Sequence, residues 1–159
     1  MSQVHDSLKY RTRWTLRKYA DEAARLADKP YDVMVVDGNM LLNAGIALLW
    51  DLAVGAGGTA WGNASARIGV GDSTTAEAAG QSGLQAAANK TYKAMAASYP
   101  QRSGQKMTWR AVFQAADANF DWREFVVDNG ATALNRKVQN LGTKAAGSEW
   151  TLDVEITLA

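Results

Sequence analysis

The sequence predicts a mainly β fold of the α+β class: a compact antiparallel β-sandwich or barrel-like domain with one buried helix and an N-terminal β-arm. From Ile68 to Ala159 the chain is a series of short segments rich in aromatic and β-branched residues, which favour strands. Only the stretch from Asn39 to Ala53 has the composition of a long helix. With 159 residues and no cysteine, the chain has the length of one domain that folds without disulfides.

Residues 1–37 are expected to form an N-terminal arm or hairpin with a short helical insertion, and residues 38–159 a β-rich core domain. Between Tyr10 and Arg17, apolar residues alternate with cationic ones. This period of two is typical of a strand with one apolar and one cationic face. Such a strand either reaches out to a neighbouring molecule or belongs to the domain's own sheet, and the pattern fits both.

The insertion and a second strand follow. Residues 20–27 are rich in helix formers and stop before Pro30, which predicts a short helix. Residues 31–35 again alternate in polarity, and Asp37-Gly38 is a turn signal. We therefore expect the second strand to pair with the first as a hairpin.

One long helix is predicted after this turn. Asn39 is a good N-cap, and the apolar residues from Met40 to Ala53 cover too broad a face for a surface helix. Glycines from Gly55 to Gly58 end it. We expect this helix to be largely buried. The glycine-rich link lacks the Lys-Ser/Thr pair of a phosphate loop and is interpreted as an ordinary connection.

The rest of the chain predicts strands and one helical turn. A capping-box pattern from Ser73 to Glu77 predicts the turn. Residues 92–99 and 106–114 are expected to pair as a hairpin across the turn-rich segment 100–104. The other strands are residues 66–72, residues 120–127 with a possible bulge, residues 133–138 and residues 150–158. Strict alternation in the last strand predicts one buried and one solvent-exposed face.

Side chains that usually carry catalysis are scarce. There is no cysteine, and the one histidine, His5, lies in the N-terminal stretch, which argues against thiol catalysis and a histidine-based triad. The closest carboxylate pairs are Asp121 with Glu124 and Asp153 with Glu155. We interpret both pairs as solvated structural charges, because nothing local would bury or tune them. No ligand spacing predicts a metal or a cofactor. We therefore expect a non-enzymatic protein.

Charge and hydropathy limit the partners. A formal net charge of +1 gives little field to gather nucleic acid. No apolar run approaches the about 20 residues that a membrane-spanning helix needs. The first ten residues lack the apolar core of a secretory signal. We expect a soluble protein, made in the cytoplasm, that binds neither nucleic acid nor membrane directly.

Tryptophan is abundant, with six residues in the chain. Trp14, Trp109, Trp122 and Trp150 lie in predicted strands, where burial in a sheet core is expected. Trp61 lies in the glycine-rich link, so we expect it to anchor an interface. Stacking on sugars or bases is the alternative for Trp61, although no basic groove accompanies it.

The chain also carries an ordered series of motifs. An asparagine-led helix is followed by an IGVGDS turn, an aromatic strand pair, an ANFDWREF strand, an LNRK segment and a terminal WTLDVEITL strand. They lie in VVDGNMLLNAGIALLWDLAVGAGGTAWGNASARIGVGDSTT, NKTYKAMAASYPQRSGQKMTWRAVFQAADANFDWREFVVDNG and ALNRKVQNLGTKAAGSEWTLDVEITL. Together these segments, in residues 31–159, resemble a family of small virion structural proteins of tailed bacteriophages, which includes head decoration proteins and tail fibre proteins.

The resemblance implies a capsid decoration, or cement, protein that binds the outer head surface and stabilises the shell. It implies a homotrimer, with the major capsid protein as the other partner, on the outer capsid surface of a virion assembled in the host cytoplasm. A tail-fibre or baseplate module for host attachment is the alternative. The absence of coiled-coil heptads and shaft repeats favours the head. A cell-envelope hydrolase would need a tuned acid–base pair, which the sequence does not predict.

The N-terminal strand would suit attachment to a shell, because an apolar and cationic strand can extend a neighbour's sheet. We therefore expect that removal of Ser2 to Leu16 leaves a folded domain with weaker particle binding. The residues expected at the interface are Tyr10, Arg11, Arg13, Trp14, Leu16, Arg17, Trp61 and Arg102.

Overall fold

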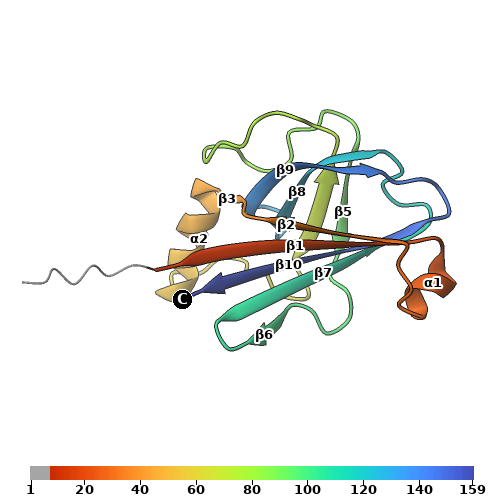
Figure 1. Ribbon diagram of the computed structural model, residues 1–159. Coiled ribbons are helices and arrows are strands. Elements are labelled where there is room, and N and C mark those ends of the chain that lie inside the picture. Colours follow the sequence, from red (N-terminus) through yellow and green to blue (C-terminus); the bar gives the residue numbers. More distant parts are fainter. Residues whose placement is uncertain (1–7) are drawn as a thin grey trace, which may run out of the picture.

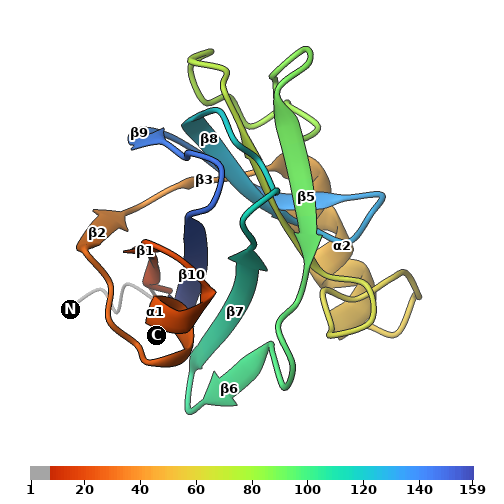
Figure 2. The same cartoon turned by 90° about the vertical axis from the view of Figure 1, so that its right-hand side faces the viewer.

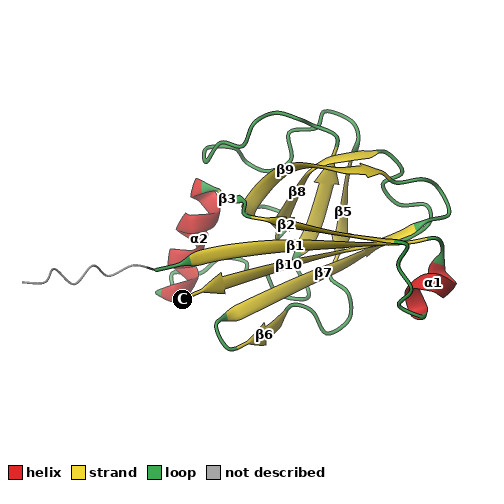
Figure 3. Cartoon of the chain, viewed as in Figure 1, coloured by secondary structure: helices red, strands yellow, loops and turns green. Residues whose placement is uncertain are grey.

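Two antiparallel β-sheets pack face to face as a sandwich in the computed structural model, which describes residues 8–159 (Figure 1, Figure 3). This confirms the predicted mainly β class and the antiparallel β-sandwich. His5, which the sequence analysis places in the N-terminal stretch, lies outside the described residues. The first sheet has the strand order β2 (Asp32–Asp37), β1 (Tyr10–Tyr19), β10 (Glu149–Leu158), β7 (Lys106–Phe113) and β6 (Gln101–Ser103). The second has the order β3 (Met40–Leu41), β9 (Ala133–Thr143), β8 (Asp121–Asp128), β4 (Arg67–Gly71) and β5 (Lys90–Ala94).

Two helices complete the domain, α1 (Glu22–Leu26) and α2 (Asn43–Ala53). They lie at opposite ends of the sandwich (Figure 1), and Figure 2 shows the two sheets on either side of the core. Helix α1 is the predicted insertion between β1 and β2. The Asp21 side chain caps it by accepting a hydrogen bond from the Ala24 backbone N–H.

Aromatic side chains join the sheets. Trp122 of β8 contacts Phe113 of β7 and Trp150 of β10 edge to face, with ring centroids 4.6 and 4.9 Å apart. Trp14 of β1 packs in the same way on Phe125 of β8, at 4.6 Å. Edge-to-face pairs of this kind stabilise a core beyond their apolar area. The predicted burial of Trp14, Trp109, Trp122 and Trp150 is therefore confirmed.

Strand β1 is an inner strand of the first sheet. It pairs with β10 from Tyr10↔Leu158 to Tyr19↔Glu149, and its other edge pairs with β2. The structure thus selects the second of the two interpretations, a strand of the domain's own sheet. The reason is the apolar face: Trp14 and Leu16 are each 1% exposed and form part of the core. Both hydrogen-bonding edges of β1 are already used, so it does not act as an arm.

Helix α2 begins later than expected and is mostly exposed. Its N-cap is Leu42, not Asn39, and no side chain caps it. Asn39 instead accepts hydrogen bonds from the hydroxyls of Tyr10 and Thr12. Gly45 is the only buried residue of α2, so the prediction of a buried helix is wrong. A broad apolar face on a helix does not by itself show that other parts of the same molecule cover it.

The predicted hairpin between residues 92–99 and 106–114 is also wrong. Strand β5 pairs with β4 in the second sheet, whereas β7 pairs with β6 and β10 in the first. The chain does reverse nearby, but at Gly104 and Gln105 between β6 and β7, because residues 101–103 form β6 itself. Local turn residues signal a reversal without showing which sheet each flanking strand joins.

No helical turn forms at residues 73–77. The Ser73 hydroxyl oxygen accepts a hydrogen bond from the Thr75 backbone N–H. Glu77 accepts one from the Val138 backbone N–H at 2.7 Å instead of closing a capping box. The segment therefore runs along β9, and a long-range contact replaces the predicted local one.

Candidate interaction surfaces

Glu124 of β8 and Arg136 of β9 form a fully buried ion pair, with 2.8 Å between Arg136 Nη2 and Glu124 Oε2. The carboxylate also accepts hydrogen bonds from the backbone N–H groups of Gln85 and Ala86. Arg136 donates further bonds to the Thr75 carbonyl oxygen and to Gln81. Both carboxylate oxygens of Glu124 accept hydrogen bonds. The ion pair therefore binds segment 75–86 to the second sheet. The prediction of a solvated charge at Glu124 is wrong.

Asp153 of β10 is also buried, at 6% exposed, although its strand position was predicted to face solvent. It accepts hydrogen bonds from Arg17 of β1 at 3.1 Å and from Arg110 of β7 at 2.6 Å. Strand β10 lies between two strands that carry arginines, whose long side chains cover the acid. The neighbouring Glu155 pairs with Lys106 at 2.6 Å. The cationic face of β1 is thus largely neutralised within the molecule.

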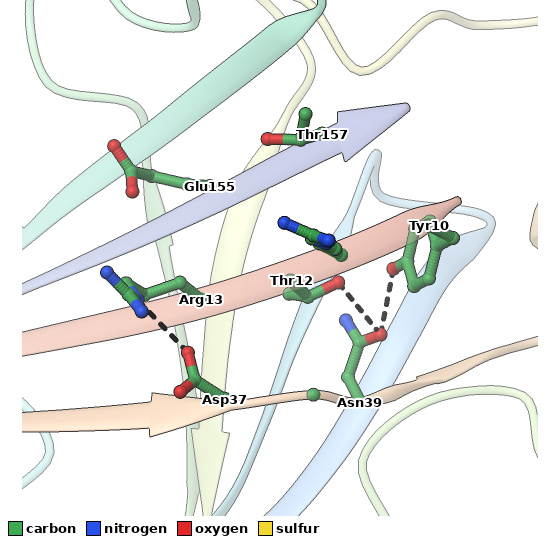
Figure 4. A pocket seen from close by; sticks show the side chains of 9 residues that line it. Tyr10, Thr12, Arg13, Asp37, Asn39, Glu155 and Thr157 are labelled. Atoms are coloured by element: carbon green, nitrogen blue, oxygen red, sulfur yellow. Dashed lines mark hydrogen bonds and ion pairs between the residues drawn. The ribbon is translucent and has the colours of Figure 1, made fainter. Parts of the chain in front are cut away.

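A polar depression of about 570 Å³ lies where β1, β10 and the β2–β3 corner meet (Figure 4). The Tyr10 hydroxyl donates to Asn39 Oδ1 at 2.8 Å, and Arg13 pairs with Asp37 at 3.0 Å. Burial raises the pKa of Tyr10 above its usual value, which keeps the phenol protonated as a donor. These contacts tie the β2–β3 corner to β1.

The predicted interface residues separate into core and surface. Trp14 and Leu16 are core residues, and Arg17 is committed to Asp153. Trp61, which was expected to anchor an interface, is only 6% exposed and donates its indole N–H to the Thr132 carbonyl oxygen, so it does not project from the surface. A second hydrogen bond, from the Trp109 indole N–H to the Trp61 carbonyl oxygen, also holds the glycine-rich link against the sandwich. Arg11, Arg13 and Arg102 are exposed, and Tyr10 is half-buried.

Exposed apolar side chains gather instead on α2. Ile46, Leu49, Trp50 and Val54 are 38%, 41%, 68% and 73% exposed. Next to them lies a groove of about 640 Å³ between α2 and the β6–β7 end of the first sheet. Its apolar lining includes Leu49, Leu52, Trp61, Met107, Trp109 and Ile156. We call these four exposed residues and the groove the α2 end surface.

Trp50, the most exposed tryptophan, was missed at the sequence level. The sequence does show that α2 has a broad apolar face. Such a face indicates either a buried helix or an exposed interface. Only the position of the helix at one end of the sandwich decides between them (Figure 1).

A second apolar feature is the free edge of β2. Met34 and Val36 point toward the core, whereas Tyr31, Val33 and Val35 are 60%, 50% and 55% exposed. The other sheet edges are protected: β3 has two residues, β6 has three exposed polar ones, and β5 carries Lys90 and Lys93. Strand β2 has six residues, with neither proline nor lysine. We call this strand with its outward residues the β2 edge.

Residues 8–159 contain no group of three or more metal-ligating side chains of histidine, cysteine, aspartate or glutamate. No helix in this range is long and apolar enough to cross a membrane. No known protein family, curated protein or solved structure matches this chain. The α2 end surface and the β2 edge carry most of the exposed large apolar side chains of residues 8–159.

Proposed function

We propose that this chain is a non-enzymatic structural protein of a tailed-phage virion that binds the outer surface of the head and reinforces the shell. In this role it assembles with itself and docks on the major capsid protein. The motifs that resemble small virion proteins supply the virion setting. The β2 edge carries the docking role.

Strand addition at the β2 edge is the way we propose that the protein docks. An extended segment of the capsid protein would hydrogen-bond to the open side of β2 and pack on Val33 and Val35. This contact combines backbone hydrogen bonds with apolar burial, and it needs no rearrangement of the domain. Strand β1, which was predicted to do this, lies between β2 and β10 and has no open side.

The arrangement of charges favours binding over catalysis. The acids that could serve an envelope hydrolase are Asp121, Glu124, Asp153 and Glu155, and each has a basic partner within 3.2 Å. A general acid or base must be free to exchange a proton with a substrate, whereas each of these carboxylates is already held by a cation. The hydrogen bond from the Thr143 hydroxyl, followed by the pairing with Arg123, holds the pKa of Asp121 below its usual value. These acids therefore suit a structural role.

Immuno-electron microscopy of intact particles of the phage that encodes this chain tests the proposal. Antibody or gold label spread evenly over the head is the expected result. Label confined to the tail tip would overturn shell reinforcement and support a host-attachment module. Particles without label would overturn a virion role altogether.

A further inference from the structure

We infer that a second copy of this chain binds at the α2 end surface, with Trp50 of each copy inserted into the groove of the other. The inference deepens the proposed function, because a protein that assembles with itself on a shell needs a surface for that contact. It names the surface, its anchor residue and a charged pair that fixes the orientation.

The helix supplies the projecting part. Residues three and four positions apart lie on one helix face, so Ile46, Leu49 and Trp50 form one apolar ridge. Leu48 and Leu52 lie on the adjoining face and pack against the core. Trp50 is 68% exposed, which leaves a large indole in water. Aromatic residues in such positions are typical anchors of protein interfaces.

The groove supplies the receiving part. Its volume of about 640 Å³ leaves room for an indole ring. Trp61 and Trp109 form part of its wall, and their indole N–H groups already donate to the carbonyl oxygens of Thr132 and Trp61. The wall therefore presents apolar ring surface. An apolar side chain that enters would gain burial without leaving these donors unpaired.

The ridge and the groove also carry opposite charges. Asp51, next to Trp50, is the only charged residue of α2. Arg102 lines the groove, is exposed, and uses one guanidinium nitrogen to donate to the Gly104 carbonyl oxygen. Lys106 also lines the groove, but its ammonium group pairs with Glu155 of the same molecule. A ridge that carries the acid Asp51 thus meets a groove that carries the cation Arg102, which sets the orientation of docking.

A second copy fits better than an unrelated partner because each molecule carries both the α2 ridge and the groove that would receive it, side by side. Leu49 belongs to the ridge and also lines the groove. Two copies related by a two-fold axis can therefore exchange Trp50 in both directions at once. Self-complementary contacts of this kind are the usual basis of symmetric oligomers. The position of α2 at one end of the sandwich leaves the β2 edge open for the capsid protein (Figure 1).

Sedimentation equilibrium of the full chain over a wide concentration range tests the inference. The wild-type protein is expected to form a dimer, and Trp50→Glu is expected to be a monomer that still unfolds in one cooperative thermal transition. The matched control is Leu26→Glu, a change at a 72% exposed leucine on α1 at the opposite end of the molecule. This variant should keep the wild-type mass. A monomeric wild-type chain, or an oligomer that survives Trp50→Glu, would overturn the inference.

Charge reversal gives a sharper test of the same contact. Asp51→Arg and Arg102→Asp should each weaken self-association about tenfold or more, because each creates like-charge contacts. An equimolar mixture of these two variants should restore the assembly, since each interface then holds one native and one reversed pair. A mixture as weak as its components would overturn the Asp51–Arg102 pairing. Because these measurements need no phage, failure here is distinct from failure of the virion labelling.

Discussion

Charged side chains in this domain owe their positions to partners on other strands or loops. Glu124 is separated from Arg136 by a strand reversal, and Asp153 meets Arg17 of β1 and Arg110 of β7. A charge buried in this way is tolerated only while its partner remains. At the residue scale, stability therefore depends on pairs more than on single residues.

Glu124→Gln should destabilise the domain by about 3–5 kcal/mol, because it leaves the charge of Arg136 buried without a counter-ion. Urea unfolding measures the change, and Asp121→Asn at a half-exposed acid is the matched control. Replacing both Glu124 and Arg136 by leucine should not restore stability, since the backbone N–H groups of Gln85 and Ala86 would lose their acceptor. A double variant as stable as wild type would contradict this account.

Asp117 should make the stability depend on acid pH. Burial alone would raise the pKa of Asp117, but hydrogen bonds from Lys93 and the Gln114 backbone N–H lower it below the usual 3.8. The ionised form therefore stabilises the fold at higher pH, and this stabilisation is lost as pH falls below about 4 through the folded-state pKa. Asp117→Asn should flatten the fall in melting temperature between pH 5 and pH 3. An unchanged slope would assign the acid sensitivity to other carboxyl groups.

At the scale of elements, α2 and β2 show how the sheets position the exposed apolar residues. Helix α2 sits close to β9 because Gly45 has no side chain: a Cβ there would lie 2.6 Å from the Leu134 carbonyl oxygen. Strand β2 has its outward row because its inward residues, Met34 and Val36, fill the core. A shift of one residue in register would exchange these two rows.

Gly45→Ala should destabilise the protein by about 1–3 kcal/mol, although alanine is the better helix former, because the backbone of β9 blocks the new methyl group. In contrast, Ala47→Gly on the exposed face of α2 should cost about 0.5–1 kcal/mol through helix propensity alone. Thermal unfolding of both variants compares the two effects. A stabilised Gly45→Ala variant would show that α2 can move away from β9.

Val35→Lys should leave folding nearly unchanged and abolish binding to phage heads. The side chain is 55% exposed, and a lysine on a strand edge opposes the addition of another strand. Co-sedimentation of purified protein with heads that lack it measures binding, with Leu26→Lys as the control. Retained binding of Val35→Lys would move the docking site away from the β2 edge.

At the scale of the whole molecule, strands β1 and β10, which are far apart in the sequence, lie side by side in one sheet. Strand β1 pairs with β10 along its full length, so the N-terminal strand completes a core that the C-terminal strand shares. Trp14 of β1 also contacts Phe125 of the opposite sheet. Both sheets therefore depend on the first strand of the chain.

Deletion of residues 2–16 should prevent cooperative folding, contrary to the sequence-based expectation of a folded, weakly binding domain. It removes Trp14 and Leu16 from the core and leaves one edge of β10 unpaired. Near-ultraviolet circular dichroism and thermal unfolding measure the loss. The control is Arg11→Ala, which removes an exposed side chain from the same strand. A truncated chain with a sharp thermal transition would show that β1 is dispensable.

The sequence by itself determined most strands, the short helix α1 and the burial of Trp14, Trp109, Trp122 and Trp150, because alternation and residue type are local properties. Only the tertiary structure decided that β1 is internal, that α2 is exposed, that β5 and β7 belong to different sheets, and that Glu124 and Asp153 are buried. The covering groups come from distant parts of the chain: Arg136 lies across a strand reversal, and Arg17 lies at the other end of the sequence from Asp153. Local patterns contain no information about such neighbours, so the exposed Trp50 and the buried Trp61 could be distinguished only in the folded molecule.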